Sequence, residues 1–238
     1  MLTLIYDVVS TILPHHTFMT GWTLCFYRNL MDTSPIPYAM DKLLKLLDRA
    51  GTMPEDLKTE LGKIMVQRTY RRREFLIKPG KVNEFLFFFC KGTARCFTVR
   101  SAGGKAEQEI NRRFLLENDF FGSLDRFHRG LIEDQYVEAL KPCIVLMTSI
   151  RSYESAMEKY PEFYKLNYET WCRTEVSSDR VADMLRLPTA AERFEFLTSN
   201  FPDLRKNIRL KYLASFMGLD TTTLYKVKNS NSANGFHL

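Results

Sequence analysis

The stretch "ASFMGLDTTTLYKVK", residues 214–228, decides how the C-terminal part of this chain folds. Ala214 is small, which lets a second helix cross closely, and Gly218 can take the left-handed conformation that ends a helix. Asp220 is a favourable N-cap for a new helix, on which Leu224 faces inward. A small residue, a glycine four positions later and an apolar residue six positions after that have the spacing of a helix-turn-helix.

The polar face of the second helix indicates contact with DNA. Such a helix enters the major groove N-terminus first, where hydroxyl groups reach phosphates or base edges and lysines face the backbone. The residues expected to contact DNA are Arg209, Lys211, Thr221, Thr222, Thr223, Tyr225, Lys226 and Lys228. An incidental helical hairpin is the alternative. The basic surroundings argue against it, because residues 203–238 hold six basic and two acidic side chains, or +4 of the formal net charge of +6.

The composition is that of a folded protein with reduced cysteines. The 238 residues suffice for two domains, and a hydrophobic share of 45% supplies a sizeable core. The positive net charge favours an acidic partner, either nucleic acid or a membrane surface. No Cys-x-x-Cys pair and no zinc-type spacing occurs, which predicts free thiols in the cytoplasm and no metal or iron–sulfur cluster. The five cysteines are Cys25, Cys90, Cys96, Cys143 and Cys172.

The sequence lacks the patterns of an enzyme. None of the four histidines lies in a Ser-His-Asp or metal-binding pattern. No glycine-rich loop that would cradle a phosphate is present. We therefore expect no catalytic residue, no metal and no cofactor.

Residues 1–39 differ in composition from the rest, with one Arg, two Asp and no Lys or Glu. The apolar run "MLTLIYDVVSTIL" is too short to span a bilayer and lacks the positive region of a secretory signal. Met40 then opens a helical pattern that reads as a natural start. The leading segment is therefore expected to lie outside the main fold, and an N-terminal docking helix is the alternative.

Strand patterns occupy the middle of the chain. Residues 40–66 first show apolar positions at intervals of three and four, which predicts two helices. From about residue 68 to residue 150, short runs rich in Phe and β-branched residues are separated by turn signals such as Pro79-Gly80. This series predicts an antiparallel barrel or sandwich.

A long helix is expected after the strands, because residues 162–187 run without Gly or Pro. A helix of this length beside a small β domain is often the seam of an oligomer, and an ordinary core helix is the alternative. A capping box formed by Thr189 and Glu192 then opens the C-terminal domain. The side chains expected along the seam are Tyr168, Trp171, Val176, Val181, Met184 and Leu185.

The order of these parts resembles the Crp/Fnr family of bacterial transcription regulators over residues 45–229. The similar segments are "FLIKPGKVNEFLFFFCKGTARCF", "ENDFFGSL", "VSSDRVADMLRL", "AERFEFL" and "LASFMGLDTTTLYKVK". The resemblance implies an α+β protein with an antiparallel β jelly-roll effector domain, a long dimerisation helix and a C-terminal all-α helix-turn-helix domain.

The expected domain boundaries follow from this resemblance. They are 1–39 for the extension, 40–150 for the cyclic-nucleotide-binding-like β domain with its N-terminal helices, 151–187 for the dimerisation region and 188–238 for the DNA-binding domain. Many members carry a β-hairpin wing after the recognition helix. Here only the polar tail "NSNSANGFHL" remains, so the wing is expected to be short or absent and the tail to be frayed.

The effector site departs from the family pattern. Members that bind cyclic AMP have Gly-Glu after paired aromatic residues and, about ten residues later, an Arg followed by Ser or Thr that grips the phosphate. Here Ser123 follows Gly122. Glu133 and Asp134 stand where the Arg would fall, and two acidic side chains repel a phosphate.

The pocket itself is still expected, because Ser177 and Ser178 keep positions at which family members touch the nucleotide base. Either another small molecule binds there or the β domain is only a scaffold. Arg126 and Arg129 are the nearby side chains that would have to replace the missing phosphate clamp. The expected pocket residues are Phe121, Gly122, Ser123, Glu133, Asp134, Ser177 and Ser178.

Together these features predict a homodimeric, sequence-specific DNA-binding transcription regulator of the cytoplasm whose β domain does not bind cyclic AMP. The expected partners are double-stranded DNA and a second copy of the chain, with an unidentified small-molecule effector and RNA polymerase as further candidates and no membrane contact. The alternative is a ligand-sensing or protein-interaction module of the same fold without DNA-binding activity. Salt dependence separates the two, because DNA affinity falls steeply as salt rises.

Overall fold

The computed structural model describes residues 36–49, 51–101 and 107–233, without the side chains of 36–37, 165–166, 169–171, 173–174 and 231–233. The expected N-terminal extension, residues 1–39, therefore lies outside the described residues except at its end. Helix α3 (Ile36–Leu47) begins before Met40, and Ala39 is fully buried in the core. The folded part thus starts a few residues earlier than the sequence pattern indicates.

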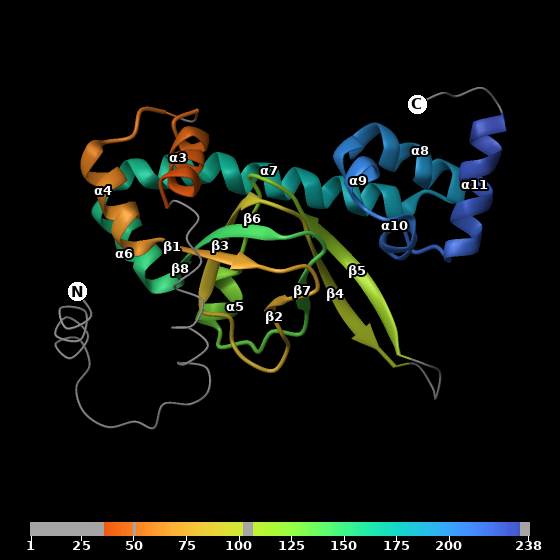
Figure 1. The fold of residues 1–238 in the computed structure, drawn as a ribbon, viewed down its shortest axis with the longest axis horizontal. Coiled ribbons are helices and arrows are strands. Elements are labelled where there is room, and N and C mark those ends of the chain that lie inside the picture. Colours follow the sequence, from red (N-terminus) through yellow and green to blue (C-terminus); the bar gives the residue numbers. More distant parts are fainter. Residues whose placement is uncertain (1–35, 50, 102–106, 234–238) are drawn as a thin grey trace. The chain divides into compact units, whose positions relative to one another are not determined.

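Two antiparallel four-stranded sheets form the β domain (Figure 1), with the strand orders β1-β8-β3-β6 and β2-β7-β4-β5. Apolar side chains of both sheets pack into one cluster, in which Phe89, Cys96 and Val145 are fully buried. This arrangement confirms the predicted antiparallel β domain of the jelly-roll type. The strands are β1 (Val66–Tyr70), β2 (Phe75–Ile77), β3 (Phe85–Lys91), β4 (Ala94–Arg100), β5 (Gln108–Leu115), β6 (Phe120–Phe121), β7 (Tyr136–Ala139) and β8 (Cys143–Ser149).

Helices cover the other face of β3 and β8. Because side chains alternate along a strand, Phe89 joins the cluster between the sheets while its neighbour Phe88 packs against the helices. These helices are α3, α4 (Glu55–Ile64) and α6 (Ile150–Lys159). The short helix α5 (Leu124–His128), which the sequence pattern did not indicate, follows β6.

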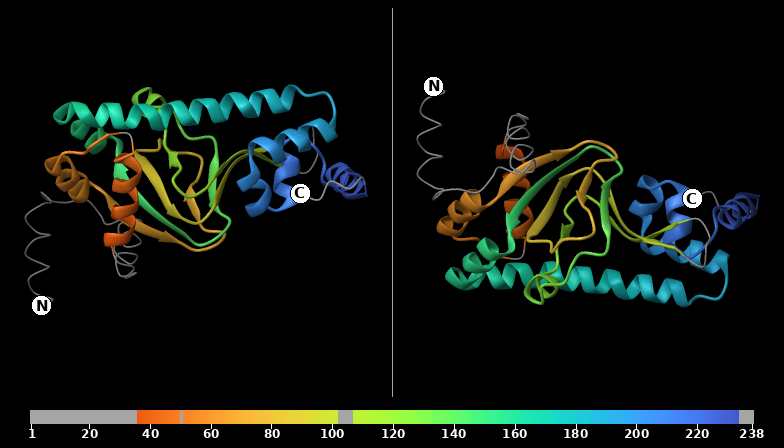
Figure 2. Two further views of the ribbon diagram at one scale, coloured as in Figure 1. Left: turned by 90° about the horizontal axis from the view of Figure 1, so that it is seen from above. Right: turned by 90° about the horizontal axis from the view of Figure 1, so that it is seen from below.

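Helix α7 (Pro161–Arg186) runs past the β strands and leads into the C-terminal helices (Figure 2). Its length agrees with the predicted uninterrupted helix. Pro161 stands at the first helical position, where its missing N–H costs nothing. No helix in the described ranges is long and apolar enough to cross a lipid bilayer.

The C-terminal unit consists of α8 (Ala190–Asn200), α9 (Pro202–Asn207), α10 (Leu210–Phe216) and α11 (Thr221–Ala233). The predicted capping box is present: the Thr189 side chain accepts from the Glu192 backbone at 3.2 Å, and the Glu192 carboxylate accepts from the Thr189 backbone at 3.0 Å. Helix α11 continues to Ala233, so the expectation that the tail frays from residue 229 is wrong for its first five residues. The described residues end with α11, so the short or absent wing stays a prediction.

Candidate functional site

The turn between α10 and α11 has the geometry that its sequence predicts. Gly218 has a φ of +68° and donates its N–H to the Ser215 carbonyl at 3.2 Å. Leu219 donates its N–H to the Ala214 carbonyl at 2.9 Å. These two bonds end α10 in the Schellman pattern, which needs a residue in the left-handed region and therefore favours glycine.

Asp220 caps the N-terminus of α11. Its carboxylate accepts hydrogen bonds from the Thr223 hydroxyl at 2.6 Å and from the Thr223 N–H at 2.7 Å. The hydroxyl bond first, and then the backbone bond, hold the pKa of the Asp220 carboxyl below its usual value. The hydroxyl of Thr223, which was expected to contact DNA, is thus engaged inside the turn.

Five exposed side chains form the outer face of α11: Thr222, Tyr225, Lys226, Asn229 and Ser230. Their intervals of three and four residues place them on one side of the helix, opposite the fully buried Leu224. The sequence pattern missed Asn229 because the tail was expected to fray, yet an Asn side chain can bind the edge of adenine bidentately. Tyr225 is 49% exposed, which makes it the largest apolar surface on this face.

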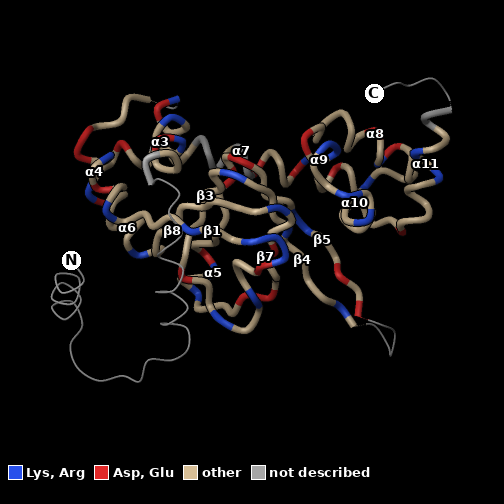
Figure 3. Tube along the Cα trace, in the orientation of Figure 1, with Lys and Arg blue, Asp and Glu red and all other residues tan. Residues whose placement is uncertain are grey.

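The remaining DNA-contact candidates flank this outer face. Arg209 and Lys211 are both exposed at the start of α10, and Thr221 and Lys228 are half-buried along α11. Figure 3 shows basic segments on α10 and α11. The candidates therefore lie on the two helices of the helix-turn-helix, Arg209 and Lys211 at the start of α10 and the others along α11.

Helix α7 carries an exposed apolar stripe. Tyr164, Tyr168, Cys172 and Val176 follow one another at intervals of four, and all four are exposed. The exposed fractions of Tyr168 and Val176 are 59% and 50%. Residues four apart are neighbours on a helix surface, so these side chains form a continuous surface, named here the α7 stripe.

Two of the other side chains expected at the seam, Val181 and Met184, point into the C-terminal unit. Met184 is fully buried in the core of the C-terminal helices, and Val181 packs against the same core. Leu185 is 42% exposed, and the side chain of Trp171 lies outside the described residues. Sequence periodicity could not separate these roles, because α7 packs on different neighbours along its length.

A cavity of about 440 Å³ lies where β6, the start of α5 and helix α7 meet; we name it the sensor cavity. It brings together four of the expected effector residues: Phe121, Gly122, Ser123 and Ser178. The Ser123 hydroxyl accepts a hydrogen bond from the Arg126 N–H at 3.3 Å and so caps α5. The charged side chains that line the sensor cavity are Arg113, Glu175 and Asp179.

Glu133 and Asp134 do not line the sensor cavity and instead lie beside Arg126. The Glu133 side chain is 3% exposed, with Oε1 at 3.9 Å from Arg126 Nε, and Asp134 Oδ1 is 3.4 Å from Arg126 Nη2. Arg129 pairs with Asp125 at 3.4 Å. Both arginines that could have replaced a phosphate clamp therefore already have acidic neighbours.

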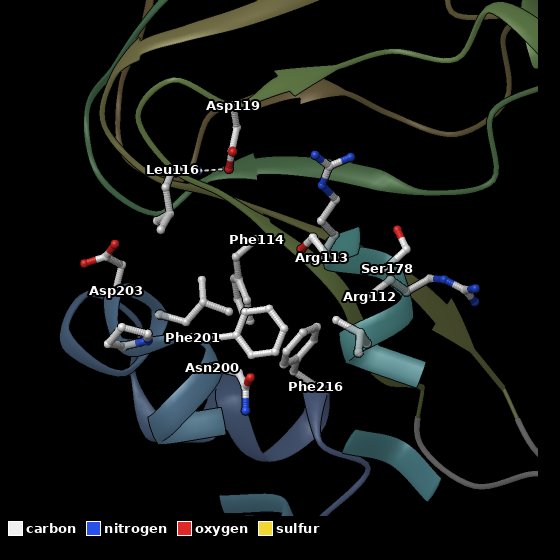
Figure 4. Close-up of a pocket in the computed structure, with 14 residues that line it drawn as sticks. Arg112, Arg113, Phe114, Leu116, Asp119, Ser178, Asn200, Phe201, Asp203 and Phe216 are labelled. Atoms are coloured by element: carbon white, nitrogen blue, oxygen red, sulfur yellow. Dashed lines mark hydrogen bonds between the residues drawn. The ribbon is translucent and has the colours of Figure 1, made fainter. Parts of the chain in front are cut away.

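A second cavity, of about 340 Å³, lies between β5, α7 and the C-terminal helices; we name it the junction cavity (Figure 4). Ser177 lines this cavity and not the sensor cavity. Its charged side chains include Arg112, Arg113 and Asp119. Asp119 accepts a hydrogen bond from the Leu116 N–H at 2.7 Å, and burial raises the pKa of its carboxyl. Ser177 and Ser178 were expected in a pocket, but no motif in the sequence pointed to Arg112 or to the aromatic side chains of this cavity.

Strand β5 and helix α10 are in direct contact. The Ser215 hydroxyl accepts from the Asn111 N–H and donates to the Glu109 carbonyl, both at 3.0 Å. Phe114 of β5 packs against Phe216, with ring centroids 5.2 Å apart. The β domain and the helix-turn-helix therefore share a polar and an apolar contact.

Arg95 is buried behind this contact. Its guanidinium donates to Glu138 at 2.7 Å and to Glu109 at 2.6 Å. It also lies 3.9 Å from the Phe97 ring centroid and 4.5 Å from that of Tyr212 in α10. Burial alone would lower the pKa of Arg95, but the hydrogen bonds to Glu109 and Glu138 outweigh it and the pKa is raised. Arg95 thus connects the sheet to the helix-turn-helix.

The cysteines of the described ranges are unpaired thiols: Cys90, Cys96 and Cys143 are buried and Cys172 is exposed. Cys25 lies outside the described residues. Among the described residues, no three His, Cys, Asp or Glu side chains gather in a way that could hold a metal ion.

No protein-family model and no curated protein matches the sequence. Solved structures do match. A mutant of CooA from Carboxydothermus hydrogenoformans has a TM-score of 0.59 at 16% identity, covering 87% of this chain and 88% of that one. CLP, the c-di-GMP responsive global regulator of Xanthomonas campestris, has a TM-score of 0.59 at 14% identity, covering 76% and 93%.

A cyclic nucleotide-binding domain containing protein from Listeria monocytogenes is similar as well. Its TM-score is 0.60 at 15% identity, and the match covers 82% of this chain and 92% of that one. The chain therefore has the fold of the Crp/Fnr regulators, a cyclic-nucleotide-binding-like β domain followed by a helical C-terminal unit, as its sequence motifs predicted.

Proposed function

We propose that this protein is a homodimeric, sequence-specific DNA-binding transcription regulator that acts in the cytoplasm. The observation that carries the proposal is the outer face of α11, a polar and exposed surface on the second helix of a correctly formed helix-turn-helix. The test is fluorescence anisotropy of the purified protein with the DNA upstream of its own gene, in excess nonspecific competitor. RNA polymerase is a further candidate partner at such a site.

Dimerisation through the α7 stripe would supply the second recognition helix. The α7 stripe exposes apolar side chains to water, and contiguous apolar patches of this kind are common at protein interfaces. The same stripe of a second copy would bury it. In a parallel two-fold pair, equal positions face each other. Two recognition helices would then reach half-sites about one DNA turn apart, roughly 34 Å.

Cys172 offers a direct test of this seam. Mild oxidation of the native protein is expected to join two chains through Cys172, giving a reducible dimer on a denaturing gel. Cys172→Ser should abolish the product and Cys25→Ser should not, and the three buried cysteines are shielded. Cross-linking that persists in Cys172→Ser, or a monomer by light scattering, would exclude this seam.

The β domain is proposed to sense a ligand other than cyclic AMP. The sensor cavity is lined by one arginine, Arg113, and by two acidic residues, Glu175 and Asp179. Glu133 and Asp134 surround Arg126. A cyclic phosphate placed there would be repelled by more negative charge than the single arginine offsets.

Calorimetric titration with cyclic AMP checks this part of the proposal. We expect no saturable heat in the micromolar range, and no change in the midpoint of thermal unfolding at the same concentrations. A ligand that binds only the native state must raise that midpoint, so a clear shift would contradict the prediction even where the heat of binding is small.

A protein-interaction module without DNA-binding activity is the second candidate. The half-exposed ring of Tyr225 at the centre of the outer face favours it, because large aromatic side chains are enriched in protein interfaces. Binding to DNA that resists competitor and weakens steeply with salt would decide for the regulator.

A further inference from the structure

Two adjacent arginines of β5 line the same cavity because the strand contains a bulge. In the β4–β5 pairing, Cys96 faces Arg113 and Phe97 faces Asn111, which leaves Arg112 without a partner. Neighbouring side chains of a regular strand point to opposite faces. A bulge inserts an extra residue and re-aims its side chain, and here both Arg112 and Arg113 line the junction cavity.

The wall opposite the arginines is aromatic and belongs to the C-terminal helices. Phe201, at the junction of α8 and α9, and Phe216 of α10 lie across the cavity from the two arginines (Figure 4). Ser177 and Ser178 of α7 add hydroxyl groups to its lining. A few polar groups beside an apolar wall, in a volume of about 340 Å³, are the usual features of a small-molecule site.

The arginine side of the junction cavity carries positive charge that could bind an anion. Within the described ranges Arg112 is exposed and makes no hydrogen bond or ion pair, while Arg113 donates to the Phe120 carbonyl at 3.2 Å. Of the two acidic residues in the lining, Asp119 is engaged with the Leu116 N–H. The other, Asp203, lies on the far side of the cavity (Figure 4).

We propose that the junction cavity binds a small organic anion with a flat apolar body, of the aromatic carboxylate class. Arg112 binds the carboxylate, since a guanidinium pairs with it through two parallel hydrogen bonds. Arg113, which also lines the sensor cavity and donates to the Phe120 carbonyl, adds positive charge beside it. The rings of Phe201 and Phe216 contact the apolar body. The sensor cavity is less suited to an anion, because its single arginine is outnumbered by Glu175 and Asp179.

Such a ligand touches both β5 and the C-terminal helices. It therefore stabilises the conformation in which β5 and the C-terminal helices are in contact. A ligand that prefers one conformation shifts the population towards it, and so changes any activity that differs between the two conformations. The inference adds an effector site to the proposed function but does not depend on DNA binding. Binding is measured without DNA, so failure of one proposal leaves the other standing.

The experiment measures displacement of anilinonaphthalene sulfonate, a fluorescent aromatic anion, from the full-length protein. Naphthoate is expected to displace the probe, and its neutral carboxamide is not. Arg112→Gln should weaken naphthoate about tenfold or more, the loss typical of a charge-assisted hydrogen bond. Ser177→Trp, which fills the cavity from an exposed position of α7, should prevent binding.

Matched controls locate the site. Glu175 lines only the sensor cavity, so Glu175→Gln leaves the lining of the junction cavity unchanged, and Arg72→Gln removes an exposed arginine that lines neither cavity. Both variants should bind naphthoate like the wild type, and circular dichroism melts should show all variants folded. Equal displacement in every variant, equal binding of the carboxamide, no saturable probe binding, or a loss in Glu175→Gln but not in Ser177→Trp would each overturn the proposal.

Discussion

Replacement of Arg95 by methionine is expected to lower the free energy of unfolding by about 3–5 kcal/mol, the cost of removing one partner from a buried ion pair. The Arg95 side chain is only 4% exposed, and that of Glu138 only 11%. Without the guanidinium, the Glu138 carboxylate stays buried with no cation beside it. Chemical denaturation followed by circular dichroism measures the change.

The matched control removes both charges. An apolar pair in place of a buried ion pair is often neutral or stabilising, so Arg95→Met with Glu138→Met should recover most of the stability that the single substitution loses. Glu109 is half-exposed and can remain hydrated. If the double variant is as unstable as the single one, the lower free energy of unfolding comes from lost packing around Phe97 and Tyr212 and not from the unpaired Glu138 carboxylate.

Arg95 contributes both to the stability of the fold and to the position of the helix-turn-helix on the β domain. Arg95 lies between Phe97 of the sheet and Tyr212 of α10, and its neighbour Asn111 bonds to Ser215. The single substitution therefore removes one side of the contact that holds α10 on β5. This contact, the packing of Phe114 on Phe216 and helix α7 all join the β domain to the C-terminal helices.

Local chemistry made much of this fold predictable from sequence. The turn at Gly218, the cap at Asp220 and the capping box at Thr189 each depend on residues a few positions apart, so their patterns are complete in a short window. The strands were recognisable because Phe and β-branched residues alternate between turn signals. These are short-range rules, and the structure follows them.

Long-range contacts were not predictable in this way. The bulge that re-aims Arg112 exists only in the pairing of β4 with β5. Met184 reads as a seam residue by periodicity, but it is buried because the C-terminal helices fold back on α7. Glu133 was placed beside a ligand from its position in a motif, whereas the structure places it against Arg126. The bulge and the burial of Met184 depend on partners far away in the sequence, whereas the position of Glu133 depends on how the loop after α5 folds.

The double substitution Tyr225→Ala, Lys226→Ala is expected to reduce affinity for the upstream DNA by about 100-fold or more. Loss of a single contact to a base or phosphate commonly costs up to a few kcal/mol. In a dimer each substitution acts at both half-sites, so the loss of binding free energy per protomer applies twice. Both side chains are exposed on the outer face of α11, so the fold should be unaffected. Anisotropy titrations with competitor DNA measure the affinity.

A matched control and a salt series separate recognition from general charge. Tyr38→Ala, Lys63→Ala removes an equally exposed tyrosine, at 49%, and an exposed lysine from the N-terminal helices, and should leave affinity unchanged. If Lys226 contacts a phosphate, Lys226→Ala alone should make the salt dependence of binding shallower by about one ion per protomer, whereas Tyr225→Ala should lower affinity at every salt concentration alike. A double variant that binds like the wild type would move recognition away from α11. Absence of DNA binding even at low salt would instead favour the interaction module, with Tyr225 as the anchor of a protein contact.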